Sequence, residues 1–184
     1  MNYSEFLKTK EFIVTDIKRE IYLAQATNDP KRKKYLEKAK VNPGGGNFLA
    51  ALGLLCYTEF LGKLRYNIKN KMGKDKARDN FNSFFDDLGS RYKRFRARGV
   101  KVYDIFRCGM DHEYHVKKSC KIYMCLKSGS RRNGIGFDKN DNKYYFVVEK
   151  YFVDFMKSLE KFEKQKYKKI TTFPFSLSRL TLTF

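Results

Sequence analysis

The feature that most constrains this chain is an apolar segment of helical length in its first third. Residues 47–70 predict one helix that Asn47 caps, and its first half, Phe48–Leu55, is apolar on every side. A helix without a polar face belongs in the middle of a core. Four small residues on it would let neighbouring helices approach closely: Ala50, Ala51, Gly53 and Gly62. The rest of the chain is therefore expected to pack around this helix.

Helical periodicity predicts several further helices along the chain. They are expected at about 4–27, 31–40, 76–88, 100–115 and 149–166. Ser4 is the expected N-cap of the first, and Asn42–Gly46 breaks the chain before the central helix.

Between the last two helices the period changes from helical to strand-like. Residues 121–126, 134–137 and 144–148 read as strands, with turns at Asn133-Gly134 and at 138–142. The predicted fold class is mainly α, with a small β-hairpin or three-stranded insertion at about 120–148, before the last helix. Residues 1–169 are expected to form a single domain, followed by an apolar tail, 170–184, whose alternation resembles an edge strand or a partner contact.

The charge of the chain indicates a polyanionic partner. Forty Lys and Arg residues against twenty Asp and Glu give a net charge of +20 over 184 residues. Such a surface attracts nucleic acid, because binding phosphates releases condensed counterions. An acidic protein partner or an anionic membrane surface remain alternatives. The N-terminal segment lacks a signal-peptide pattern, no apolar run is long enough for a membrane span, and the four cysteines are too scattered for a disulfide framework. A cytoplasmic location is expected.

The segment Phe106–His115 carries the best candidate active site. Both histidines of the chain, His112 and His115, lie in it, and Arg107 precedes His112 by five positions. In a metal-independent RNA cleavage, histidine moves the proton of the ribose 2′-hydroxyl or of the leaving oxygen, and arginine stabilises charge on the phosphate.

A helical wheel separates this segment into two arcs. Five residues are expected to face the core: Val102, Tyr103, Phe106, Met110 and Tyr114. The opposite arc holds Asp104, Arg107, Cys108, Asp111, His112 and His115, with Arg107 and His112 about 140° apart. A two-fold axis would bring such a pair together. The alternative is a solvated helix face with an Arg107–Asp111 ion pair.

The run Arg107-Cys108-Gly109-Met110-Asp111-His112 resembles the Arg-x4-6-His motif of HEPN domains, a superfamily of helical bundles. The resemblance implies a HEPN-type bundle, often dimeric, in which Arg107 and His112 are the catalytic pair of a metal-independent endoribonuclease without a cofactor. Such members act in phage defence or in toxin–antitoxin systems, which implies an antitoxin or a larger defence complex as a further partner. Cys108, Asp111 and His115 would support the pair. Active members usually carry a polar residue, often Asn, where this chain has Cys108. The alternative is a non-catalytic RNA-binding or protein-interaction module.

Two basic segments are candidates for RNA binding. The first is Lys31, Arg32, Lys33 and Lys34; the second is Arg91, Tyr92, Lys93, Arg94, Arg96 and Arg98, within the run that ends at Lys101. Arginine contacts phosphates and stacks on bases, and Tyr92 is expected to stack as well. Both segments are expected to form one surface beside the Arg/His helix. The alternative is a solvated helix end with Phe95 turned inward.

No metal site is predicted. Five potential zinc ligands lie close in the sequence: Cys108, His112, His115, Cys120 and Cys125. Cys120 and Cys125 would face opposite sides of a strand, however, so they are not placed to share one ion. Asp138, Asn140, Asn142 and Glu149 match calcium-loop positions, but Lys143 stands where the loop needs glycine, which favours a polar hairpin turn. Gly44–Gly46 before a helix lacks the Gly-Lys-Ser/Thr of a phosphate-binding loop.

Overall fold

A computed structural model of the protein describes residues 1–25, 29–40, 47–109, 120–124 and 133–167. Helices account for most of them, and a small three-stranded sheet precedes the final helix, as predicted. The elements are α1 (Tyr3–Gln25), α2 (Pro30–Lys38), α3 (Asn47–Tyr66), α4 (Ala77–Asp87), α5 (Ser90–Ala97), the π-helix η2 (Tyr103–Cys108), β1 (Cys120–Tyr123), β2 (Ile135–Asp138), β3 (Lys143–Val147) and α7 (Val148–Lys166). The predicted tail 170–184 and the glycines 44–46 lie outside the described residues.

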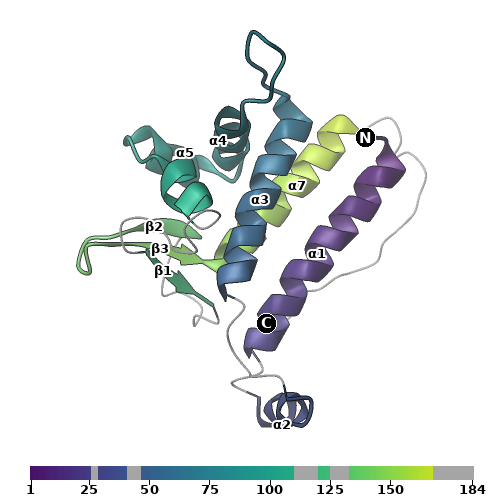
Figure 1. Ribbon diagram of the computed structural model, residues 1–184, viewed down its shortest axis with the longest axis vertical. Coiled ribbons are helices and arrows are strands. Elements are labelled where there is room, and N and C mark those ends of the chain that lie inside the picture. The colour runs from purple at the N-terminus through teal and green to yellow at the C-terminus, as the bar shows by residue number, and fades with distance from the viewer. Residues whose placement is uncertain (26–28, 41–46, 110–119, 125–132, 168–184) are drawn as a thin grey trace.

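Helix α3 occupies the centre of the molecule (Figure 1). It contacts α1, α4, α7, β1 and η2, as expected for the most apolar helix of the chain. Its first half is not buried all round, however. Ala50, Ala51, Leu54 and Leu55 are fully buried, whereas Leu49 is 63% exposed because no described element covers that side of the first turn. The prediction for Phe48–Leu55 was therefore too broad.

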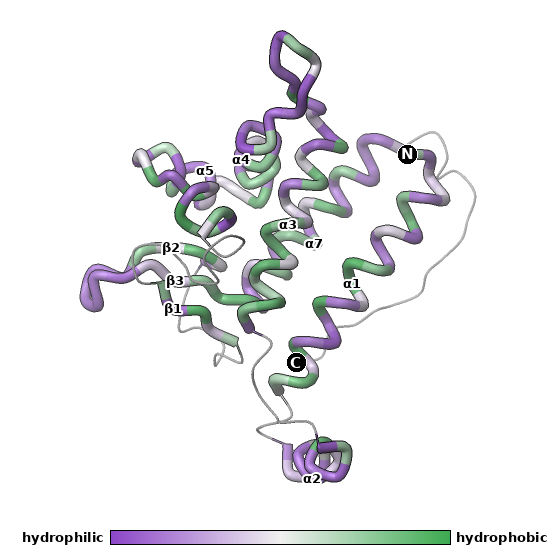
Figure 2. Tube along the Cα trace, in the orientation of Figure 1, coloured by the Kyte–Doolittle hydropathy of each residue, from purple (hydrophilic) through white to green (hydrophobic). Residues whose placement is uncertain are grey.

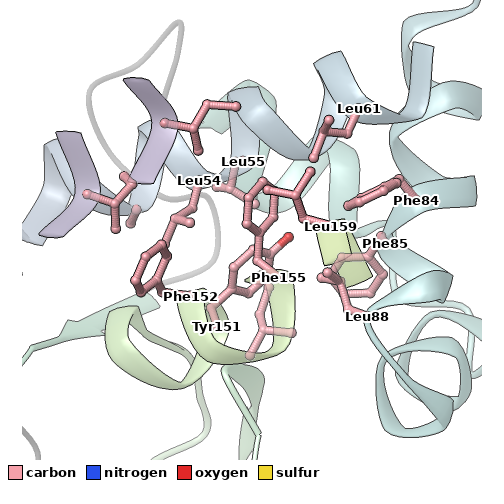
Figure 3. Packing of buried hydrophobic residues seen from close by; sticks show 14 of the residues in the cluster. Leu54, Leu55, Leu61, Phe84, Phe85, Leu88, Tyr151, Phe152, Phe155 and Leu159 are labelled. Atoms are coloured by element: carbon pink, nitrogen blue, oxygen red, sulfur yellow. The ribbon is translucent and has the colours of Figure 1, made fainter. Parts of the chain in front are cut away.

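The core is built from the facing sides of α3, α4 and α7 (Figure 3). Leucines of α3 contact phenylalanines of α4 and a mainly aromatic stripe of α7. The stripe comprises Tyr151, Phe152, Phe155, Leu159 and Phe162, all at helical spacing. Burial of these large side chains supplies the main driving force for folding.

Gly62 allows α3 and α4 to cross at backbone contact. A Cβ atom at this position would lie 2.0 Å from the carbonyl oxygen of Asn80 in α4. Asn80 is itself buried, and its carboxamide exchanges two hydrogen bonds with the backbone of Ile68, at 2.8 and 3.1 Å. The expected close approach at Gly62 is thus confirmed, and Asn80 ties the loop after α3 to the same crossing.

The helix ends follow local side-chain chemistry. Asn2, not Ser4, caps α1: its Oδ1 accepts from the amide of Glu5, and the Glu5 carboxylate accepts from the amide of Asn2, both at 2.9 Å. The central helix stops at Tyr66 and not near residue 70, because Asn67 adopts φ 49°, a left-handed conformation that ends helices.

The sheet has the order β1-β3-β2, with β1 parallel and β2 antiparallel to β3. Strands β2 and β3 form the predicted hairpin, in which Asp138 lies opposite Lys143. The side chain of Asn47, at the start of α3, donates to the carbonyl of Ile122 at 3.3 Å and so links the central helix to β1. Figure 2 shows that the hairpin tip and α2 are mainly hydrophilic, in contrast to α3.

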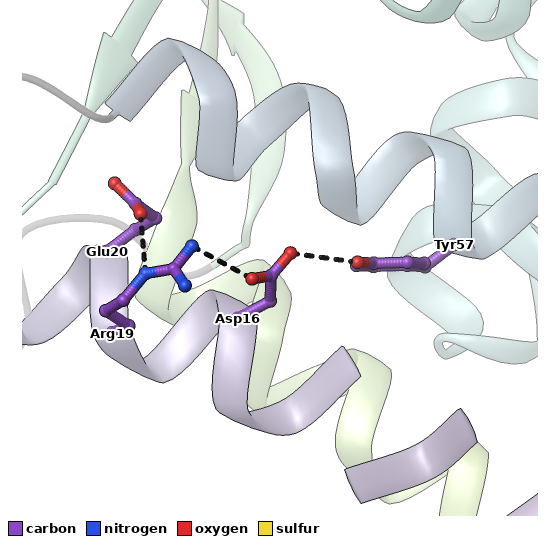
Figure 4. A network of polar contacts seen from close by, with 4 residues as sticks. All are labelled: Asp16, Arg19, Glu20 and Tyr57. Atoms are coloured by element: carbon purple, nitrogen blue, oxygen red, sulfur yellow. Dashed lines mark hydrogen bonds and ion pairs between the residues drawn. The ribbon is translucent and has the colours of Figure 1, made fainter. Parts of the chain in front are cut away.

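A polar network joins α1 to the outer side of α3 (Figure 4). The hydroxyl of Tyr57 donates to Asp16 at 3.2 Å, and Arg19 bridges Asp16 and Glu20. Burial, together with the charge of Asp16, raises the pKa of Tyr57 to about 12.

Among the residues that the structure describes, no helix combines the length and the apolar character that crossing a bilayer requires.

Candidate functional site

The candidate arginine lies on a π-helical turn. The predicted helix 100–115 appears as η2, which begins after a turn with Gly99 at φ 83°. The buried apolar side chains are those of Val102, Ile105 and Phe106, so the apolar stripe includes Ile105, whereas Tyr103 is only half-buried. π-Helical turns inside helical segments occur frequently at functional sites. Here the turn places Arg107 directly after the buried stripe.

Arg107 faces the central helix and forms an ion pair there. Its Nε donates to Oε2 of Glu59 at 2.9 Å, and the two side chains are 15% and 25% exposed. The expected placement of Arg107 on an open face opposite the core is therefore wrong. The reason lies in the tertiary packing: α3 contacts η2 and places the carboxylate of Glu59 beside Arg107.

The pair borders a pocket of about 280 Å³ between α3, the start of α4 and η2. Its polar lining comprises Cys56, Glu59, Lys63, Asp75, Asn80 and Arg107. Lys63 and Asp75 form a second ion pair in the same wall. Two cations and two carboxylates thus line the pocket, and an incoming phosphate would have to compete with Glu59 for Arg107.

Tyr103 and Cys108 flank Arg107 and stay protonated at neutral pH. Burial raises the pKa of Tyr103 to about 12, and the charge of Glu59 adds to the shift while Arg107 opposes it. The pKa of the Cys108 thiol is raised as well, mainly by burial and secondly by the charge of Asp104. A protonated thiol is a poor nucleophile, so Cys108 is not suited to attack a phosphate or acyl group.

The other members of the predicted site are not placed by the structure. Asp111, His112 and His115 lie outside the described residues. The alternative Arg107–Asp111 ion pair therefore falls outside them as well.

The second basic segment forms α5 and the turn after it. Arg91, Lys93, Arg94 and Arg98 are exposed, which fits a contact with a polyanion. Arg96 is held by both carboxylate oxygens of Asp86, with Nε to Oδ1 at 2.8 Å. Phe95 packs inward on Tyr144.

The predicted stacking role of Tyr92 is wrong. Tyr92 is only 3% exposed, and its hydroxyl donates to Asp154 at 2.8 Å while accepting from the amide of Gly134 at 3.1 Å. Tyr92 therefore fastens α5 to α7 and to the residue before β2. Sequence pattern cannot distinguish this inward position from the outward one, because tyrosine suits both.

The first basic segment does not join the second. Residues 31–34 lie on α2, at the lower end of the view in Figure 1, whereas α5 lies beside the sheet. The prediction of one continuous basic surface is wrong within a single chain.

No group of three or more His, Cys, Asp and Glu side chains in the described part of the chain is arranged to hold a metal ion. Of the cysteines and histidines weighed for zinc, only Cys108 and Cys120 are described, and burial raises the pKa of Cys120 to about 12, which disfavours the thiolate that zinc binds.

Sequence reasoning missed Glu59. It is the single carboxylate in α3, and Lys63 stands four positions later on the same helix, where a partner within the helix is the ordinary expectation. Nothing in the sequence therefore signalled a contact with Arg107.

No protein-family model, no curated protein and no solved structure matches this chain.

Proposed function

We propose that the protein is a metal-independent endoribonuclease of HEPN type that cuts RNA by internal transesterification. The observation that carries the proposal is the position of Arg107, which lines a pocket with charged side chains while its backbone is anchored by the core residues Ile105 and Phe106. A preorganised guanidinium of this kind stabilises charge that develops on a phosphate. The net charge of +20 supports RNA as the substrate.

In the proposed reaction the ribose 2′-oxygen attacks phosphorus and the 5′-oxygen leaves. His112 transfers the proton of the attacking hydroxyl or supplies one to the leaving oxygen, and the products are a 2′,3′-cyclic phosphate and a 5′-hydroxyl. Arg107 exchanges the carboxylate of Glu59 for the phosphate that becomes pentacovalent. A homodimer that apposes two motif segments completes the site, and an antitoxin or a defence complex is the expected regulator.

Incubation of the protein with total RNA in EDTA tests this proposal. We expect cut RNA with cyclic phosphate ends, intact DNA, and a loss of at least about 100-fold in Arg107→Ala and His112→Ala. Lys157→Ala, at an exposed position on α7, is the control. Mixed Arg107→Ala and His112→Ala subunits should regain part of the activity. Activity that EDTA abolishes and magnesium restores would contradict the mechanism.

The ion pair itself favours a second candidate, a non-catalytic RNA-binding or interaction module. In that case the Arg107–Glu59 pair only fastens η2 to α3. Arg107→Lys separates the two candidates. The nuclease loses cleavage and keeps RNA binding, whereas the module shows no cleavage in any form and loses only stability.

A further inference from the structure

A second pocket shares no lining residue with the first. It has a volume of about 240 Å³ and is bordered by α4, the turn after α5 and the start of η2. Six lining residues carry the argument: Arg78, Asn82, Arg96, Lys101, Tyr103 and Asp104. The volume lies below the range of about 300–1,000 Å³ of pockets for drug-sized ligands, so it suits a small group such as a ribose phosphate.

The charges of this pocket favour an anion. Arg78 pairs with Asp104 at 2.7 Å, with 61% of the arginine side chain exposed. Lys101 is exposed and makes no ion pair within the described residues. An ion pair as open as that of Arg78 contributes little, so exchanging its carboxylate for a phosphate has a low cost.

Asn82 adds an unsatisfied acceptor. Its Oδ1 is buried and accepts no hydrogen bond from any described residue. Buried polar atoms are nearly always paired, and an exception calls for an explanation. Asn82 lines the pocket, and its amide torsion is a broad one, so a rotation would bring this oxygen to a bound ligand. A ribose 2′-hydroxyl is a donor of the required kind.

Tyr103 connects this pocket to the candidate catalytic pocket. Tyr103 lines the second pocket, and Arg107, four positions later on the same π-helical segment, lines the first. A nucleotide held here would therefore be close in the RNA chain to a phosphate held at Arg107.

We propose that this pocket binds the ribose phosphate of a nucleotide that flanks the scissile phosphate, with Arg78 and Lys101 on the phosphate and Asn82 on the 2′-hydroxyl. The inference rests on the proposed function for the location of the scissile phosphate. Its binding chemistry is tested independently of cleavage.

The test uses His112→Ala protein, which the proposed mechanism makes unable to cut, and short fluorescent single strands of RNA and of DNA with the same sequence. Affinity is measured by anisotropy over a range of salt concentrations. The variants are Arg78→Ala with Lys101→Ala, and Asn82→Ala. The matched control removes two exposed lysines of α7, Lys157→Ala with Lys161→Ala. Thermal unfolding establishes that each variant is folded.

The pocket double variant should bind RNA at least about tenfold more weakly than the control, because it loses both cations that contact the phosphate. Its salt slope should fall by about 0.7, the value for one phosphate of a single strand. Asn82→Ala should weaken RNA binding about fivefold and leave DNA binding unchanged. A salt slope equal to that of the control, or an equal loss for RNA and DNA in Asn82→Ala, overturns the assignment.

Cleavage by the protein with His112 intact, assayed separately, reports on the proposed function. If the pocket variants lose RNA binding but no form of the protein cuts RNA, the proposed nuclease activity is overturned and the pocket assignment is supported. If the protein cuts RNA but the salt slope of the pocket double variant equals that of the control, the nuclease is supported and the pocket assignment is overturned.

Discussion

Two successive residues of α3, Thr58 and Glu59, face two different environments. Thr58 is fully buried; its hydroxyl donates to the carbonyl of Leu54 at 2.8 Å and lies 2.9 Å from the hydroxyl of Tyr151. Glu59 is partly exposed and holds Arg107. A step of about 100° around one helix thus leads from the core to the candidate site.

The difference concerns what each region does with its polar groups. On the core side, the hydroxyls of Thr58 and Tyr151 are buried and hydrogen-bonded, so the loss of either partner would leave a buried polar group unsatisfied at a high cost in stability. On the site side, the partners are charged and border a pocket, so a charged ligand can compete for them. Substitutions on the core side should therefore act on stability, and those on the site side on binding or activity.

The largest effect is expected at the α3–α4 crossing, where the core side has least room. Gly62→Ala places a methyl group against the backbone of Asn80 and should lower the free energy of unfolding by about 3 kcal/mol. Gly53→Ala is the matched control, because its Cβ would make only an ordinary contact, 3.4 Å from Ile17. Urea denaturation measures both. Equal stability of the two variants would contradict the close α3–α4 contact at Gly62.

A second prediction separates the two sides of α5. Tyr92→Phe removes the partner of the Gly134 amide and one of the two partners of Asp154, and should cost about 2 kcal/mol without changing RNA affinity. The double variant Arg94→Ala with Arg98→Ala should weaken RNA binding and leave stability nearly unchanged, since both side chains are exposed. Denaturation and RNA titration are run on both proteins. Weaker RNA binding by folded Tyr92→Phe would contradict the structural role of Tyr92.

The neighbours on α3 give the direct test. Thr58→Val leaves the buried hydroxyl of Tyr151 without its partner and should cost about 1–2 kcal/mol. Glu59→Gln weakens a partly exposed pair and should cost about 0.5 kcal/mol. If RNA cleavage is found, it should change only in Glu59→Gln. A larger stability loss in Glu59→Gln than in Thr58→Val would reverse the proposed contrast.

The smallest effect is a pH dependence on the outer side of α3. The pKa of Tyr57 is raised from 10.0 to about 12, so the fold favours its protonated form. The resulting stability is present below pH 10 and is lost as the pH rises toward 12. Tyr57→Phe should flatten part of the fall in melting temperature over this range. Tyr35→Phe, at an exposed position on α2, is the control, and identical slopes would contradict the assignment.

Periodicity predicted the helices and strands well because burial follows it directly. The stripe of α7, the β2–β3 hairpin and the central place of α3 all came from the spacing of apolar residues. The errors lie at ends and on surfaces. Ser4 and Asn2 are both good N-caps, and only the observed hydrogen bonds decide between them.

For the candidate site, the sequence identified Arg107 but not its surroundings. Its neighbour in the pocket wall, Glu59, is 48 positions away in the chain. Spacing within one helix carries no information on such a contact. The same limit applies to Tyr92, whose partners Gly134 and Asp154 are 42 and 62 positions away.

The sequence by itself determined the fold class, the central helix, the strand insertion and the basic character of the protein, because each depends on local periodicity or on composition. Only the tertiary structure decided that Arg107 is paired with Glu59, that Tyr92 is buried and that the two basic segments lie apart. These facts depend on which helix faces pack together, and packing joins residues that are distant in the chain.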